Sequence, residues 1–131
     1  MNARQNPVRL LLAGCCLLAA CSNTSTAGEQ ARTFVFVEIP ESIMPIERGH
    51  KYEDPLDDAL KQARLGEVMG GGTNLSKDHA IEWVGIDVEL TDLDKGLPFL
   101  KQKLIELGAP ESSMLEYRVR NRSFAVPIRD R

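Results

Sequence analysis

The feature that most constrains the fold is an alternating run of ten residues, IEWVGIDVEL, from Ile81 to Leu90. Successive side chains of a β-strand point to opposite faces, so this run presents one wholly apolar face. That face consists of Val84, Ile86, Val88 and Leu90. The opposite face is mixed and consists of Ile81, Trp83, Gly85, Asp87 and Glu89. Such a strand predicts an antiparallel sheet with one face against a core and the other partly wet.

Further strands are predicted from composition and alternation. Residues 33–39 (TFVFVEI) are β-branched or aromatic and apolar on both faces, which predicts a central strand. Residues 113–120 alternate between apolar and charged side chains and predict another strand. Residues 67–69 predict a short extended segment, and residues 124–128 predict a short edge strand. In the strand predicted over residues 113–120, the side chains expected to face inward are Leu115, Tyr117 and Val119.

Two stretches have the spacing of helices that are buried along one side. The first is expected to begin at Asp54, which can cap free backbone N–H groups, and to close at Gly66. The second is expected to be regular only from Leu97, because Pro98 removes a helical hydrogen bond near its start. Residues 40–53 are expected to form a long loop. The buried stripes are Leu56, Ala59, Leu60 and Ala63 in the first, and Leu93, Leu97, Leu100, Leu104 and Leu107 in the second.

The order strand, helix, strand, strand, helix, strand predicts an α+β fold of the ferredoxin-like βαββαβ type. Its four-stranded antiparallel sheet carries both helices on one face, and right-handed crossovers leave few other topologies. We expect a single domain over residues 33–131, for which 43% hydrophobic and 27% charged residues are ordinary. The segments EDPLDDAL, GEVMGGGTNL and GIDVEL, between Phe36 and Tyr117, are similar to a small bacterial domain family. This resemblance implies one compact domain and no particular activity.

The first twenty residues predict an export signal. Two arginines precede an apolar or small run of eleven residues that ends at Ala20, whereas a membrane span needs about twenty. The run closes with Leu-Ala-Ala-Cys at Cys21, which resembles the lipobox of bacterial lipoproteins. That resemblance implies cleavage before Cys21, lipidation of Cys21 and attachment to a bilayer. A second match, ending at Cys15, leaves too short an apolar run. An ordinary secretory signal with a free Cys21 is the other alternative.

The chain after residue 20 is acidic. Residues 1–20 hold two of the sixteen basic residues and none of the nineteen acidic ones, which leaves a net charge of −5. This balance argues against nucleic-acid binding. Both other cysteines leave with the signal, so no disulfide, thiol nucleophile or cysteine metal site is expected. Residues 21–32 are small and polar and predict a flexible tether with a reach of about 20 Å. In Gram-negative lipoproteins an Asp directly after the lipidated Cys favours the inner membrane. The resemblance, with Ser22 at that position, therefore implies the periplasmic side of an outer membrane.

Motifs that could carry chemistry are weak. Gly70, Gly71 and Gly72 could offer N–H groups to an anion, but no Lys-Ser or Lys-Thr leads from them into a helix. A bulge in an edge strand is the favoured interpretation. His50 lies among carboxylates, without a second histidine at metal-ligand spacing. We expect no cofactor, no metal and no catalytic residue. The alternative is a small-molecule or metal-binding sensor or enzyme that uses the His50 loop and the glycine segment.

The mixed face of the sheet is the predicted contact surface. With helices on the apolar side, Ile81 and Trp83 point to the open face, and the last strand adds Arg118 and Arg120. The first strand adds either Phe34 and Phe36 or Val35 and Val37. Tryptophan and arginine commonly carry the energy of protein interfaces. We therefore predict a non-enzymatic protein-binding module, for example a toxin-neutralising immunity lipoprotein. In the alternative, the C-terminal tail or a second copy of the chain covers this face.

Overall fold

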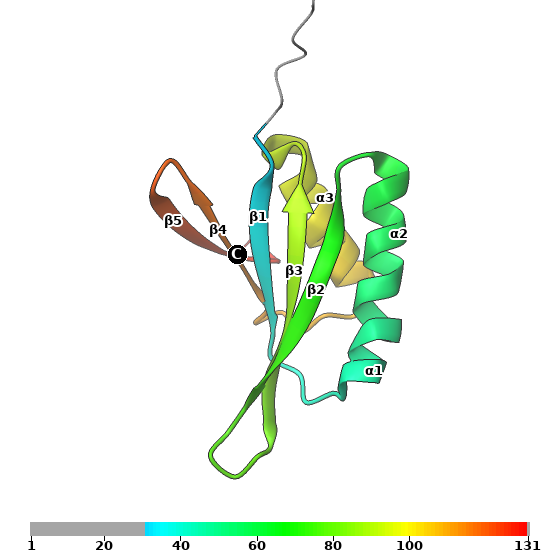
Figure 1. Cartoon of the computed structure of the whole chain (residues 1–131), viewed down its shortest axis with the longest axis vertical. Helices are drawn as coiled ribbons and strands as arrows, with labels where there is room; N and C mark the ends of the chain where they lie inside the picture. The colour runs from blue at the N-terminus through cyan, green and yellow to red at the C-terminus, as the bar shows by residue number, and fades with distance from the viewer. Residues whose placement is uncertain (1–30, 131) are drawn as a thin grey trace, which may run out of the picture.

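The computed structural model describes residues 31–130, which form one sheet covered by helices on one side (Figure 1). The predicted signal at residues 1–20, the predicted lipidation site Cys21 and most of the predicted tether lie outside this range. The strands are β1 (Thr33–Ile39), β2 (Gly66–Leu75), β3 (Ile81–Leu90), β4 (Met114–Val119) and β5 (Arg122–Pro127). The helices are α1 (Pro45–Arg48), the π-helix η1 (Gly49–Glu53), α2 (Asp54–Ala63) and α3 (Leu93–Glu106).

The sheet is antiparallel and has the spatial order β2-β3-β1-β4-β5. The prediction of a mixed α+β fold with an antiparallel sheet is confirmed, and β1 is central as predicted. The number of strands is five rather than four. The fifth, β5, arises because the chain reverses at Arg120 and Asn121, whose φ angles of 46° and 65° build a two-residue hairpin turn.

The core lies between the sheet and the helices α2 and α3 (Figure 1). The face of β3 predicted to be apolar is fully buried, and so are alternate residues of β1. Two leucines of each predicted helical stripe are fully buried, whereas Ala63 is exposed and the other stripe residues are partly buried. The fully buried side chains are Val35, Val37 and Ile39 of β1, Val84, Ile86, Val88 and Leu90 of β3, Leu115 of β4, Leu56 and Leu60 of α2, and Leu100 and Leu104 of α3.

The predicted loop over residues 40–53 is wrong in its second half. The chain becomes helical at Pro45, continues through η1 and runs directly into α2, so Asp54 lies inside a helical path and caps nothing. Tyr52 supplies the physical reason, because the helical path places its side chain fully inside the core. At the other end, Arg64 takes the left-handed conformation expected of Gly66.

Helix α3 is also longer than predicted. It begins at Leu93, and the side chain of Asp92 caps it by accepting a hydrogen bond of 3.0 Å from the N–H of Lys95. Pro98 lies within the helix. Because Pro98 is close to the start and exposed to solvent, only one early hydrogen bond is lost, and the cap holds the first turn in place.

Candidate functional site

The face of the sheet opposite the helices carries three aromatic side chains, Phe34 and Phe36 of β1 and Trp83 of β3, which we call the aromatic row. Phe36 and Trp83 pack edge to face, with ring centroids 5.9 Å apart and an interplanar angle of 78°. Phe34 is 54% exposed. Gly85 makes this packing possible, because a Cβ atom at that position would lie 2.6 Å from the Phe36 ring.

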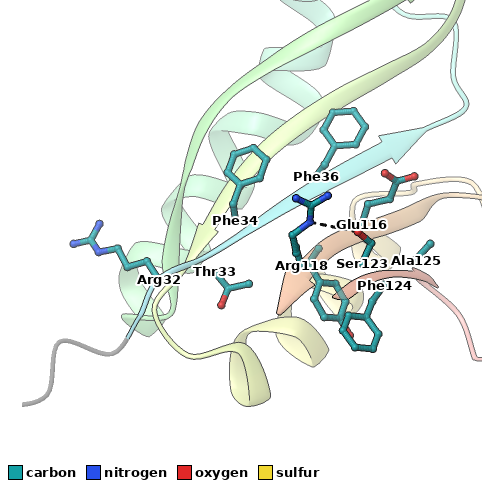
Figure 2. A pocket seen from close by; sticks show the side chains of 10 residues that line it. Arg32, Thr33, Phe34, Phe36, Glu116, Arg118, Ser123, Phe124 and Ala125 are labelled. Carbon is teal, nitrogen blue, oxygen red and sulfur yellow. Dashed lines mark hydrogen bonds between the residues drawn. The ribbon is translucent and has the colours of Figure 1, made fainter. Parts of the chain in front are cut away.

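A hollow of about 620 Å³ lies beside the row, between the start of β1 and the β4–β5 hairpin (Figure 2). It arises because β1 pairs with β4 only from Val35↔Tyr117 to Glu38↔Met114, whereas β4 stays paired with β5 up to its turn. On the N-terminal side of Val35, β1 and β4 are therefore no longer paired and diverge. The hollow is lined by Arg32, Thr33, Phe34, Phe36, Glu116, Tyr117, Arg118, Ser123, Phe124 and Ala125.

The walls of this hollow combine aromatic rings with charged side chains. Tyr117 and Phe124 stack with their centroids 5.2 Å apart. The Nε of Arg118 is 3.4 Å from the Oγ of Ser123, as Figure 2 shows. On the opposite flank of the aromatic row, Arg32 binds the carboxylate of Glu89 at 3.1 Å. The site thus offers flat apolar contacts rimmed by both charge signs, with Glu116 and Arg118 on β4 and the Arg32–Glu89 pair beside β3.

The structure does not bring the predicted site residues together, because Trp83 lies beyond the Ile39↔Val84 pair and Arg118 beyond the Val35↔Tyr117 pair, at opposite ends of β1. Trp83 and Arg118 both lie on strands at the open face, as the sequence predicts. Ile81 begins β3 opposite Leu75 and packs against the margin of the core. Arg120 is not on β4, which ends one residue earlier. The two-residue turn takes Arg120 off the strand.

The aromatic row settles a choice that the sequence left open. The first strand could have added Phe34 and Phe36 or Val35 and Val37 to the open face, and the structure places the phenylalanines there. Sequence reasoning missed Ser123, and it placed Phe124 in the predicted edge strand without assigning it to a site; both residues line the hollow. The alternation of side chains along β5 could have predicted them. The start of β5 was not recognised because the hairpin turn before it contains no glycine.

The glycine segment has a structural role. Gly70, Gly71 and Gly72 lie inside the edge strand β2, with a register shift at Val68/Gly70, so the predicted bulge is confirmed. A Cβ on Gly71 would overlap the side chains of Arg48 and Glu53.

Those two side chains form a nearly buried clasp between the helical segment and β2. Arg48 donates to Glu53 at 2.5 Å and, at 2.9 Å each, to the carbonyl of Gly72 and the hydroxyl of Thr73. The space beside the backbone of Gly71 is therefore filled by the Arg48–Glu53 ion pair of this protein.

His50 does not join the glycines in a site for anions. Its side chain is exposed and pairs with Asp54 at 3.4 Å. The groove between η1, α2 and β2 is small, about 200 Å³, and Glu53, Asp54 and Asp57 line it beside Gly70. These three carboxylates line the same groove, and their negative charge disfavours a bound anion there. Within residues 31–130, no group of three or more His, Cys, Asp or Glu side chains could hold a metal ion.

A second polar cluster, absent from the sequence predictions, joins the segment after β1 to η1. The carboxylate of Glu41 accepts hydrogen bonds of 2.5 Å from Lys51 and from the hydroxyl of Tyr52. Burial, together with the bond to Glu41, raises the pKa of Tyr52 to about 12. Burial opposes ionisation of Glu41, yet the bonds from Lys51 and Tyr52 outweigh it and lower the pKa of that carboxyl. The cluster fixes the helical path over the core.

No family model, curated protein or solved structure matches this chain. In the part of the chain that the structure describes, no helix has the length and apolar character needed to cross a bilayer.

Proposed function

We propose that this protein is an exported bacterial lipoprotein, tethered through Cys21, that acts as a non-enzymatic protein-binding module. The observation that carries the proposal is the aromatic row, which lies on the sheet face that α2 and α3 leave uncovered and includes a half-exposed Phe34. Large exposed apolar side chains next to arginine are typical of protein interfaces. An immunity protein that neutralises a toxin is one concrete form of this function.

The fold proposed for this module is ferredoxin-like with an added strand. The strands β2, β3, β1 and β4, together with α2 and α3, follow the βαββαβ order and the spatial order of that fold. The strand β5 then extends the open face beyond β4. The extension supports a binding role, because Ser123 and Ala125 complete the wall of the hollow.

The interface is tested by site-specific photo-crosslinking in the producing cell. With p-benzoylphenylalanine in place of Phe34, we expect one adduct with a different protein. The same probe at Ile46, which is 77% exposed on α1, serves as the matched control and should give no such adduct. Arg118→Glu, in a variant that keeps its melting temperature, should abolish the Phe34 adduct. An adduct with the mass of two copies of this chain, or equal adducts from both positions, would contradict the proposal.

The tether is tested separately by Cys21→Ser. Acyl chains on Cys21 would supply the strong membrane affinity, so this variant should appear in the soluble fraction with an unchanged melting temperature. The measurement is membrane fractionation followed by a salt wash, with Ser22→Ala as the matched control. A Cys21→Ser protein that stays with washed membranes would show that the protein is not lipid-anchored through this residue.

A further inference from the structure

The β4–β5 turn lies at the end of the sheet where the tether enters. Strand β4 is antiparallel to β1 and pairs Tyr117 with Val35, so the chain beyond Tyr117 runs toward the start of β1. Figure 1 shows the turn between β4 and β5 at the same end of the molecule as the first residues of β1. The α1 segment and the β2–β3 turn lie at the opposite end. Any anchor upstream of residue 31 therefore holds the turn, and not α1, toward its point of attachment.

Three arginines gather at this turn: Arg118, Arg120 and Arg122, which we call the basic tip. All three are exposed. Arg118 contacts the hydroxyl of Ser123, and the guanidinium of Arg122 lies over the Phe124 ring, 5.6 Å from its centroid. None of them has an ion pair with a carboxylate of residues 31–130, whereas Arg129 pairs with Glu111 and Arg32 with Glu89. Their charge is thus available to an external anion.

The position and charge of the tip together define its partner. We infer that the basic tip docks on the anionic lipid headgroups of the membrane that holds the tether, and so sets the orientation of the domain. The inference rests on the proposed tether. The protein after residue 20 has a net charge of −5, so a free domain is repelled from an anionic surface as a whole, and only the tip can approach it.

The tether makes a weak contact effective. Three arginines alone give marginal affinity for a membrane, but the proposed tether would keep the tip at millimolar effective concentration near the surface. A flexible chain of twelve residues, the number from Cys21 to Arg32, spans about 20 Å, which is enough for the turn to touch the headgroups. In this orientation only the end of the sheet at the β4–β5 turn touches the membrane. Trp83, at the other end of the open face, remains accessible to a protein partner.

The experiment attaches the chain to vesicles by chemistry, so that it does not depend on lipidation in the cell. A chain that begins at Cys21 keeps the core that the structure describes, because within residues 31–130 the buried apolar residues lie between Val35 and Ile128. Its single thiol is coupled to a maleimide lipid. Phe34→Trp in a Trp83→Phe background places a single tryptophan beside the turn, where quenching by lipids brominated near the headgroup reports the approach of the tip to the surface. We expect quenching severalfold stronger on vesicles that contain phosphatidylglycerol than on phosphatidylcholine alone, and reversal by salt.

Arg120→Gln/Arg122→Gln should reduce this quenching to the level on phosphatidylcholine. The matched control is Lys77→Gln/Arg129→Gln, which removes the same charge outside the tip and should leave the quenching unchanged. Quenching that is equal on both vesicles, or that survives the tip substitutions, would overturn the inference. So would a tip double variant that loses only the photo-crosslinked adduct, because the tip would then contact an acidic protein instead. Failure of Cys21 lipidation in the cell would leave the vesicle result intact, which separates the two proposals.

Discussion

The two sides of β1 use equally apolar residues for different purposes. On the helix side, Val35, Val37 and Ile39 are fully buried under α2 and α3. On the other side, Phe34 is 54% exposed and Phe36 contacts only one other ring in the aromatic row. Branched aliphatic residues therefore build the core, whereas the aromatic row lies on the face that no helix of residues 31–130 covers, with Phe36 and Trp83 partly buried and Phe34 half exposed. The difference shows that apolarity alone does not tell a core residue from a contact residue, and that coverage by other elements decides.

The comparison is tested most strongly on the covered side. Leu100→Ala removes a fully buried side chain from the centre of α3 and should lower the free energy of unfolding by about 2–5 kcal/mol. Chemical denaturation measures the effect. Gln102→Ala, on the exposed side of the same helix, is the control and should change the stability by less than about 0.5 kcal/mol. Equal losses from the two variants would mean that α3 faces the sheet differently.

The pH dependence of stability tests the polar margin of the core. The folded protein holds the Tyr52 phenol at a pKa of about 12, above the ordinary value of 10.0, so it binds the phenolic proton more tightly than the unfolded chain. This stabilisation is complete below pH 10 and is lost as pH rises toward 12; its size is at most about 2–3 kcal/mol. Tyr52→Phe should flatten this part of the profile. A wild-type profile that matches that of Tyr52→Phe between pH 10 and 12 would refute the assignment.

Gly85 marks a place where the open side is tightly packed. Gly85→Ala places a Cβ atom against the Phe36 ring and should cost about 1–3 kcal/mol through forced displacement of the aromatic row. Thermal denaturation measures the loss. Gly72→Ala, with nothing within 4 Å of the added Cβ, is the matched control on the neighbouring strand. Combining Gly85→Ala with Phe36→Leu should restore part of the loss; a loss that persists unchanged would show that the clash lies elsewhere.

The smallest effect on stability is expected at Phe34. Phe34→Ala should change the free energy of unfolding by less than about 1 kcal/mol, because much of the side chain is already in water. The same substitution should abolish binding once a partner has been identified by crosslinking. A loss of several kcal/mol would place Phe34 among the core residues and remove the distinction between the two sides of β1.

Sequence reasoning succeeds where local pattern decides the structure. The bounds of β3 and its buried face follow from simple alternation, and the central place of β1 follows from its two apolar sides. It fails where distant contacts decide. The helical path from Pro45 is stabilised by Tyr52 in the core and by Glu41, although Gly49 and His50 have weak helical preference.

The candidate site divides in the same way. Trp83 and Arg118 follow from alternation along their strands and are found where predicted. The choice between the phenylalanines and the valines of β1 cannot be made from its own sequence, because both sets are apolar; it depends on which side the helices cover. The hollow depends on where β1 and β4 stop pairing, a property of two strands that are distant in the sequence.

The clasp at β2 has a consequence for molecules held side by side on one surface. The outermost strand of a sheet can recruit the strand of a neighbour, and anchoring a population in two dimensions multiplies such encounters. Along β2, Asp57 accepts the N–H of Val68 at 2.9 Å, and Arg48 occupies the carbonyl of Gly72. These bonds engage two backbone groups that a neighbouring strand would need, so they disfavour strand-to-strand pairing along this part of the edge.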